Sequence, residues 1–275
     1  MSYYYRGTGF AQTPPVIKNL VIINVIVFAL TKLGIMMHWF NLYDIFSLYY
    51  PDSEKFKPLQ FVTHMFMHGD IMHILLNMFM LWMFGRILEN VWGGKRLFIY
   101  YMITGLGAAL LHTFVNFLEF NSIAKAAEVF TQNPTPAQFA LFVRDKFPMF
   151  YDNIYSEFLH GWFKNPGNND YIPMAQQYIS ELTQYKLNIP TVGASGAVYG
   201  VLLAFGMTFP NVELYLMFFP FVPIKAKYMV VGMGVLELLY GVSQPGSNIA
   251  HFAHLGGMIF GFILIKYWKK TTRMY

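Results

Sequence analysis

The chain has 275 residues, of which 56% are apolar and only 12% are charged. Soluble domains carry about 25% charged residues, so this composition excludes a water-soluble globule and indicates an integral membrane protein. The net charge of +5 is scattered without forming a basic stripe, which argues against nucleic-acid binding, and the absence of cysteine excludes disulfides and thiolate metal sites.

Six segments are apolar enough to cross a bilayer as helices, which takes about 20 residues each. They cover residues 19–39, 70–88, 97–118, 194–210, 227–243 and 249–267. The flanking lysines and arginines then fall on one side of the membrane, apart from Lys32, whose long side chain can snorkel outward. The positive-inside bias therefore predicts a multi-pass protein with both termini in the cytoplasm. We expect it in the lipid of a plasma membrane, the inner membrane of a bacterium.

The third and fourth spans are separated by a long segment, which this topology places on the outer side. Within it, TPAQFALFVRDKF is typical of a helix with Thr135 as its cap and Pro136 in its first turn. In PMAQQYISELTQY, apolar side chains recur at helical spacing, at Met174, Tyr178, Ile179, Leu182 and Tyr185. We expect an amphipathic, aromatic-rich subdomain on the membrane surface. The expected organisation is spans one to three in 1–118, a helical insertion in 119–190, and spans four to six in 191–275.

Polar side chains inside membrane spans are unfavourable, so each indicates a function. Ser195 opens the fourth span in IPTVGASGAVYG, and His254 lies near the start of the sixth in NIAHFAHLGGMIFG. His73 and Asn77, in HILLN of the second span, are four residues apart and share one helix face. All three spans enter from the outer side, so a rise of about 1.5 Å per residue brings these side chains to a similar depth.

These four residues could together perform acyl transfer. Ser195 would be the nucleophile and His254 the general base that accepts its proton. The side chains of His73 and Asn77, with the backbone N–H of Ser195, could stabilise the oxyanion. No carboxylate is obviously placed to orient His254, so the sequence predicts a dyad and not a triad.

Small and aromatic residues would support this site. Gly193 and Gly196 would let a substrate backbone approach, and Tyr199 could stack on the ring of His254. Gly257 and Gly261 repeat the spacing of Gly196-xxx-Gly200, and such small-xxx-small pairs allow helix backbones to approach closely. We therefore expect the fourth and sixth spans to touch.

Each residue also has a simpler interpretation. Ser195 could be a small packing residue, His73 and Asn77 could form interhelical hydrogen bonds, and His254 could relay protons or bind a metal. The other histidines that make a metal site conceivable are His64, His68, His73 and His251. No HExxH motif accompanies them and the necessary carboxylates are missing, so we expect neither a metal nor a cofactor. GASGA also differs from the G-x-S-x-G nucleophile elbow.

Three motifs carry a resemblance to a known family. GASG with a tyrosine four residues after the serine, AHLGGMIFG matching AHxxGxxxG, and HILLN matching HxxxN are the signatures of rhomboid intramembrane proteases. They lie on spans four, six and two, as in the six-helix form of that family, and the resemblance covers about 50–118 and 190–267. It implies one all-α domain over about 15–270, a six-transmembrane-helix bundle with the insertion between helices three and four.

The resemblance also implies roles for individual residues. Ser195 would be the nucleophile, His254 the base, and His73 and Asn77 the oxyanion donors, in a water-filled cavity open to the outer side and capped by the loop SQPGSN. The chain departs from the family pattern at Leu59-Gln60, where many members carry Trp-Arg, which bears on how that loop is anchored.

Two further polar residues are expected near this site, one close to His254 in the sequence and one inside a neighbouring membrane span. His251 lies a turn outward from His254 and could contact substrate or line the cavity, with lining favoured. Glu237 lies inside the fifth span, where it could pair with a polar group of a neighbouring helix.

The function predicted is therefore hydrolysis of a peptide bond in or near a transmembrane segment of another membrane protein. By resemblance, that substrate helix would enter sideways past the fifth span. A second hypothesis is a catalytically silent relative that binds client proteins as a chaperone. A third is a small transporter or proton channel with His254 and Glu237 as relays, but the internal repeats common in transporters are not found. The sequence predicts no oligomeric state.

Overall fold

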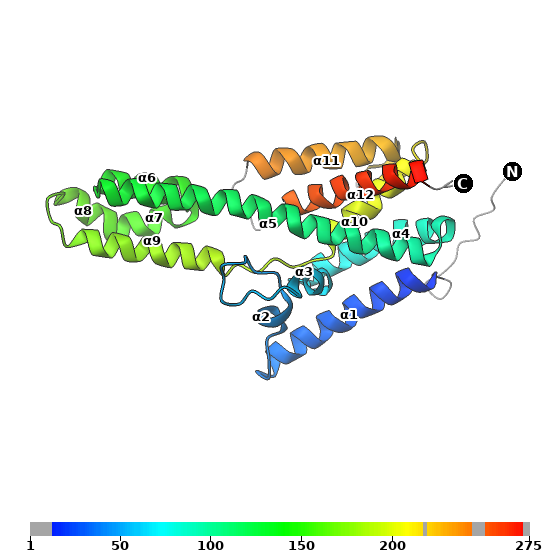
Figure 1. Cartoon of the computed structure of the whole chain (residues 1–275), viewed down its shortest axis with the longest axis horizontal. Helices are drawn as coiled ribbons and strands as arrows, with labels where there is room; N and C mark the ends of the chain where they lie inside the picture. The colour runs from blue at the N-terminus through cyan, green and yellow to red at the C-terminus, as the bar shows by residue number, and fades with distance from the viewer. Residues whose placement is uncertain (1–12, 217–218, 244–250, 272–275) are drawn as a thin grey trace. The chain divides into compact units, whose positions relative to one another are not determined.

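The structure, a computed structural model, describes residues 13–216, 219–243 and 251–271. Six helices correspond to the predicted spans (Figure 1): α1 (Pro15–Met36), α4 (Ile71–Trp92), α5 (Gly94–Gln132), α10 (Ser195–Thr208), α11 (Ala226–Ser243) and α12 (His251–Thr271). Shorter elements join them: α2 (Leu42–Phe46), α3 (Gln60–Thr63), η2 (His64–Phe66), α6 (Pro136–Lys146), η3 (Pro148–Phe150), α7 (Tyr151–Ile154), η4 (Tyr155–Leu159), α8 (His160–Lys164) and α9 (Tyr171–Leu187).

Four of the described helices, α1, α4, α5 and α11, are long and apolar enough to cross a membrane. Helix α10 is apolar but has only 14 residues. Helix α12 has 21 residues, but histidines occupy its first turn and lysines its last. The predicted fold class, a polytopic helical membrane protein, is confirmed.

The all-α prediction missed one small hairpin. Strands β1 (Glu213–Leu216) and β2 (Phe219–Lys225) pair antiparallel between α10 and α11, with Glu213 opposite Lys225. The stretch is almost continuously apolar and shows no alternation of polar and apolar residues, so its sequence pattern does not distinguish a strand from a helix end.

The chain folds into two compact units. One comprises residues 1–48, 57–112 and 190–275, and the other residues 49–56 and 113–189. Helix α5 contributes residues to both, because the division falls within it, after His112. The helix also continues to Gln132, beyond the predicted end at residue 118. Good helix formers in IAKAAEVF extend it, and Pro134 is the first residue that prevents continuation.

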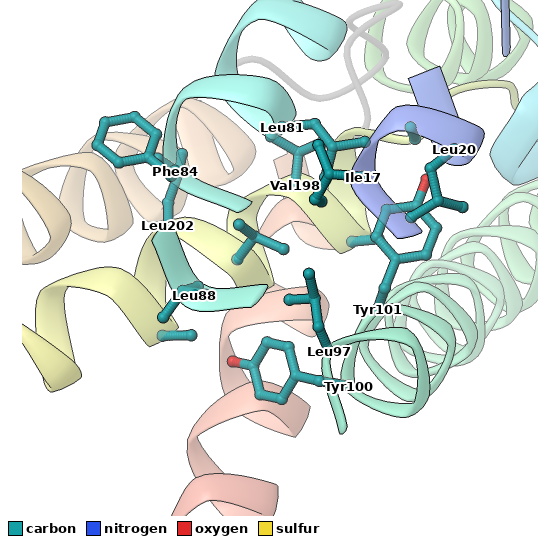
Figure 2. Close-up of a cluster of buried hydrophobic side chains, with 14 of the residues drawn as sticks. Ile17, Leu20, Leu81, Phe84, Leu88, Leu97, Tyr100, Tyr101, Val198 and Leu202 are labelled. Atoms are coloured by element: carbon teal, nitrogen blue, oxygen red, sulfur yellow. The ribbon is translucent and has the colours of Figure 1, made fainter. Parts of the chain in front are cut away.

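The core of the first unit is built mainly from α1, α4, α5 and α10, with Met65, Ala226 and Ile265 added from η2, α11 and α12. Figure 2 labels the following of its buried side chains: Ile17, Leu20, Leu81, Phe84, Leu88, Leu97, Tyr100, Tyr101, Val198 and Leu202. A buried carboxylate fixes the start of α1, because the oxygens of Glu89 accept the backbone N–H groups of Val16 and Ile17 at 2.9 and 2.8 Å. These N–H groups have no partner inside their own helix, so Glu89 satisfies them and complements the helix dipole.

Close glycine contacts bring α10 and α12 together, as predicted. A Cβ atom on Gly257 would lie 1.8 Å from the carbonyl oxygen of Gly196. The second glycine of each pair has a different neighbour, however. Gly200 packs against Thr104, and Gly261 packs against Thr104 and the hydroxyl of Tyr100, all on α5. The close contact between α10 and α12 is therefore made at the first glycine of each pair, Gly196 and Gly257.

The second unit has a core of its own, rich in aromatic residues. Its fully buried side chains include Phe130, Phe139 and Trp162. Helix α6 begins as predicted, with the Thr135 hydroxyl accepting the N–H of Gln138.

The predicted apolar face of α9 is only partly right. Leu182 is buried, and Tyr178 and Ile179 pack against the core of the second unit. Met174 and Tyr185, in contrast, are about half exposed, at 50% and 49%. Ala175 takes the inner position near Met174, because a small side chain lets the helix approach the aromatic cluster.

Candidate active site

Ser195 is the first residue of α10, and the turn before it depends on glycine. Gly193 has a φ of 125°, a conformation that residues with a Cβ rarely adopt. Its N–H donates to the carbonyl of His64 at 3.0 Å, which fixes the approach to the helix. Ser195 therefore lies at a helix start, where backbone N–H groups have no partner within the helix.

The structure brings Ser195 and His254 together from helices α10 and α12. The Oγ of Ser195 lies 2.8 Å from the Nε2 of His254, within hydrogen-bond distance. The ring of Tyr199, one turn along α10, stacks on that of His254 with centroids 4.2 Å apart and planes 3° from parallel. This stack holds the plane of the imidazole and was anticipated from the spacing of Tyr199.

A carboxylate lies beside His254, where the sequence shows none that is obviously placed to do so. The Oε1 of Glu237, on α11, is 3.0 Å from the Nδ1 of His254. The hydroxyl of Tyr199 donates a hydrogen bond to the same oxygen. The sequence does not predict this contact, because Glu237 belongs to none of the three motifs. The sequence indicates only that a charged residue lies inside an apolar span and needs a partner.

His251 is buried beside the same carboxylate, with its Nδ1 2.6 Å from the Oε2 of Glu237. That it lines the cavity stays a prediction. Its ring also stacks against Tyr240 of α11, with centroids 5.7 Å apart. His251 thus restrains the second oxygen of the carboxylate whose first oxygen is close to His254.

His73 also lies beside Ser195. A Cβ atom added to Gly193 would be 2.8 Å from the Nε2 of His73 and 3.6 Å from the Oγ of Ser195, so both side chains flank this glycine. The N–H of Gly69 points toward the Nδ1 of His73 at 3.5 Å, an arrangement in which Nε2 would carry the ring proton. The ring can then present an N–H next to the hydroxyl of Ser195.

Asn77 is on the same face of α4, but one of its amide hydrogens is used within that helix. Its Nδ2 donates to the backbone carbonyl of His73 at 2.8 Å. A second hydrogen on the same nitrogen remains available as a donor. The arrangement brings together a hydroxyl, an imidazole, a nearby carboxylate and N–H donors, which are the kinds of group that acyl transfer uses.

The loop before α4 is anchored although it lacks the Trp-Arg pair. Gln60 is buried, and its side chain donates to the carbonyl of Ile45 and accepts the N–H of Lys57. Thr63 adds a hydrogen bond to the carbonyl of Phe46 at 2.8 Å. Leu59-Gln60 therefore supports the loop through Gln60. The predicted cap SQPGSN lies outside the described residues except for its first serine.

Two histidines in this loop region are buried without charge. Burial lowers the pKa of His64 to about 4, and burial together with the nearby His73 lowers the pKa of His68 to about 3. The ring nitrogens of His68 have no hydrogen-bond partner within the described part of the chain. Both rings are thus neutral in the folded protein at neutral pH.

This predicts that acid destabilises the fold. An unfolded histidine titrates near pH 6.5, so below that pH the unfolded chain binds protons that the folded chain excludes, and the free energy of unfolding falls. The loss begins at about pH 6.5 and continues to about pH 4 for His64 and about pH 3 for His68. Each group approaches a slope of about 1.4 kcal/mol per pH unit.

Thermal unfolding in detergent at about pH 7 and about pH 4 measures this effect. His68→Phe keeps the ring volume and removes the titrating group, so the variant should lose less stability on acidification than the wild type. His160→Gln, at an exposed position, is the control and should keep the wild-type dependence. An equal loss in His68→Phe and wild type would contradict the prediction.

Three side chains could hold a metal ion. Within the described residues, ligand atoms of Glu237, His251 and His254 lie within 4.8 Å of one another. Two imidazoles and a carboxylate form a set that zinc accepts. This group of ligands differs from the one considered from the sequence. It does not include His64 or His68, and it does include a carboxylate.

Comparisons with known proteins agree with the motifs. A family model described as Rhomboid domain matches residues 55–124 and 156–270. Rhomboid-like protein 11, chloroplastic, of Arabidopsis thaliana is 38% identical over 85 residues, covering 30% of this chain and 30% of that protein. Rhomboid protein 1, mitochondrial, of Saccharomyces cerevisiae is 23% identical over 259 residues, covering 93% of this chain and 55% of that protein. The chain thus spans less than two thirds of the length of either relative.

Proposed function

Because the chain belongs to the rhomboid family, we propose that it is an intramembrane serine endopeptidase. It would hydrolyse a peptide bond in or near a transmembrane segment of another membrane protein. The observation that carries this proposal is the 2.8 Å contact between the Oγ of Ser195 and the Nε2 of His254. Neutral imidazole at hydrogen-bond distance from a hydroxyl is the pairing that makes serine a nucleophile near neutral pH.

The geometry supports a sequence of steps. Ser195 attacks the scissile carbonyl while His254 takes the hydroxyl proton at Nε2. The backbone N–H of Ser195 and the Nε2–H of His73, with Asn77 as a further donor, stabilise the negative oxygen. His254 then gives its proton to the leaving amine, which releases the first product. Water, activated by the same imidazole, hydrolyses the acyl-enzyme.

The substrate proposed is a helix from another membrane protein that enters past α11. Large apolar side chains of α11, including Leu236, Leu238 and Leu239, are half exposed on its surface and are suited to contact with lipid or a partner helix. An intact helix hides its carbonyl groups in backbone hydrogen bonds, so the cleaved segment must unwind. We therefore expect small or helix-weakening residues near the scissile bond.

We propose that both termini lie on the cytoplasmic side of a plasma membrane, because flanking basic residues favour that side. Residues 119–190 would then form an extramembrane insertion on the outer side, within one rhomboid domain over about 15–270. The two relatives are named as mitochondrial and chloroplastic proteins, which makes an organellar membrane the second candidate.

A fluorophosphonate probe tests this function without knowledge of the natural substrate. Such a probe reacts with an activated serine, so the full-length protein in detergent should be labelled at Ser195, and Ser195→Ala should not be labelled. Mass spectrometry of the adduct identifies the residue. A folded wild-type protein that is labelled no faster than Ser195→Ala would favour the catalytically silent, client-binding alternative.

A further inference from the structure

We infer that Glu237 is a positioning residue that orients the base His254, so that Ser195, His254 and Glu237 act as a triad. This inference rests on the proposed function. Its basis is the path of contacts from Ser195 Oγ to His254 Nε2 at 2.8 Å, and from His254 Nδ1 to Glu237 Oε1 at 3.0 Å. The three residues come from α10, α12 and α11, so three separate helices must pack correctly to form it.

The carboxylate would select one tautomer of the imidazole. An ionised carboxylate only accepts hydrogen bonds, so the nitrogen that faces it is the one that carries the proton. With Nδ1 protonated beside Glu237, the lone pair of Nε2 faces the hydroxyl of Ser195 and can accept its proton. The other tautomer would direct an N–H toward Ser195 and could not act as a base.

At rest the Nδ1 of His254 and the Oε1 of Glu237 are at ion-pair distance but are not aligned as a full hydrogen bond. Contacts of this kind are often loose before substrate binds and tighten during the reaction. When His254 takes up the proton of Ser195, it becomes a cation next to an anion in a region of low dielectric, which strengthens the attraction.

Glu237 is itself held in place by two other side chains. It is only 8% exposed, the hydroxyl of Tyr199 donates to its Oε1, and His251 lies 2.6 Å from its Oε2. Tyr199 therefore restrains both members of the pair, through its ring on His254 and its hydroxyl on Glu237. If Glu237 only stabilised the packing of α11, its carboxylate would not need to face the Nδ1 of His254, the ring nitrogen on the side away from Ser195.

The test compares Glu237→Gln with a matched variant, Glu89→Gln. Both replace a buried glutamate of the same unit by its amide, but Glu89 contacts the backbone of α1 and not His254. The rate of fluorophosphonate reaction at Ser195 should fall about 10- to 1000-fold in Glu237→Gln, because the wrong tautomer becomes populated. Glu237→Asp keeps the charge and should recover part of that rate.

Nitrogen-15 NMR of the His254 ring separates a positioning role from a merely structural one. The signal is assigned by its loss in His254→Gln. In wild type, Nδ1 should carry the proton of the neutral ring, and in Glu237→Gln a substantial fraction should shift to Nε2, whereas Glu89→Gln should resemble wild type.

The inference is overturned if Glu237→Gln keeps the wild-type reaction rate within about threefold, or if the tautomer of His254 is unchanged while the rate falls. Failure of the proposed function looks different. Wild-type protein would then not be labelled at Ser195, and the NMR comparison, which needs no turnover, would still decide whether Glu237 controls the ring of His254.

Discussion

Replacing His254 by alanine is expected to lower peptide-bond cleavage to below about a thousandth of the wild-type rate, and Ser195→Ala should do the same. Without the imidazole, the Ser195 hydroxyl loses the group at hydrogen-bond distance that would take its proton, and a neutral hydroxyl is a poor nucleophile. The measurement is the turnover of a membrane-protein substrate by the full-length chain, reconstituted in lipid vesicles.

Replacing Ser195 and His254 together should lower cleavage no further than replacing either one alone. Residues that act as one unit are strongly non-additive, so Ser195→Ala with His254→Ala should be no slower than either single variant. His160→Ala, at an exposed position of the second unit, is the matched control and should cleave at the wild-type rate. Cleavage above about a thousandth of wild type by folded His254→Ala would remove His254 from the role of base.

The candidate site was largely readable from the sequence because it follows from short, local patterns. GASG places Ser195 at a helix start, the AHLGGMIFG stretch places His254 and Gly257 on one helix, and HILLN places His73 one turn from Asn77. Each pattern fixes side chains relative to a single helix. The packing of α10 against α4 and α12 then brings these side chains together.

The features of the site that could not be predicted depend on contacts between helices, and no short sequence motif marks the residues that make them. Glu237 lies on a helix that carries no motif, and only the packing of α11 against α10 and α12 brings it to Tyr199, His251 and His254. Sequence could indicate that a buried charge needs a partner but not which one.

The inner face of α9 was misjudged for a related reason. Helical spacing selects Met174 and Tyr185 as well as Leu182, but the aromatic core of the second unit extends over only part of that face. Apolar periodicity predicts which residues share a side of a helix. It does not predict how far the neighbouring elements cover that side.

Gly257→Val is expected to disrupt the packing of α10 on α12 and with it the site. A single Cβ at this position would already lie 1.8 Å from the carbonyl oxygen of Gly196, and that atom belongs to a helix backbone, which cannot rotate away as a side chain can. Overpacking against side chains lowers the free energy of unfolding by about 1–3 kcal/mol. A clash with backbone should lower it by at least the upper value of that range. The two helices must move apart, which also separates Ser195 from His254.

Two measurements check this prediction, the thermal unfolding midpoint in detergent and the rate of fluorophosphonate reaction at Ser195. Both should fall in Gly257→Val. Gly232→Ala is the control, because the space around Gly232 on α11 is open and alanine favours a helix by about 0.5–1 kcal/mol over glycine. Gly232→Ala should therefore be as stable as wild type or more so. An unfolding midpoint and a reaction rate that both stay at the wild-type level in Gly257→Val would mean that α10 and α12 do not meet at this glycine. The helix contact that positions Ser195 against His254 would then have to lie elsewhere.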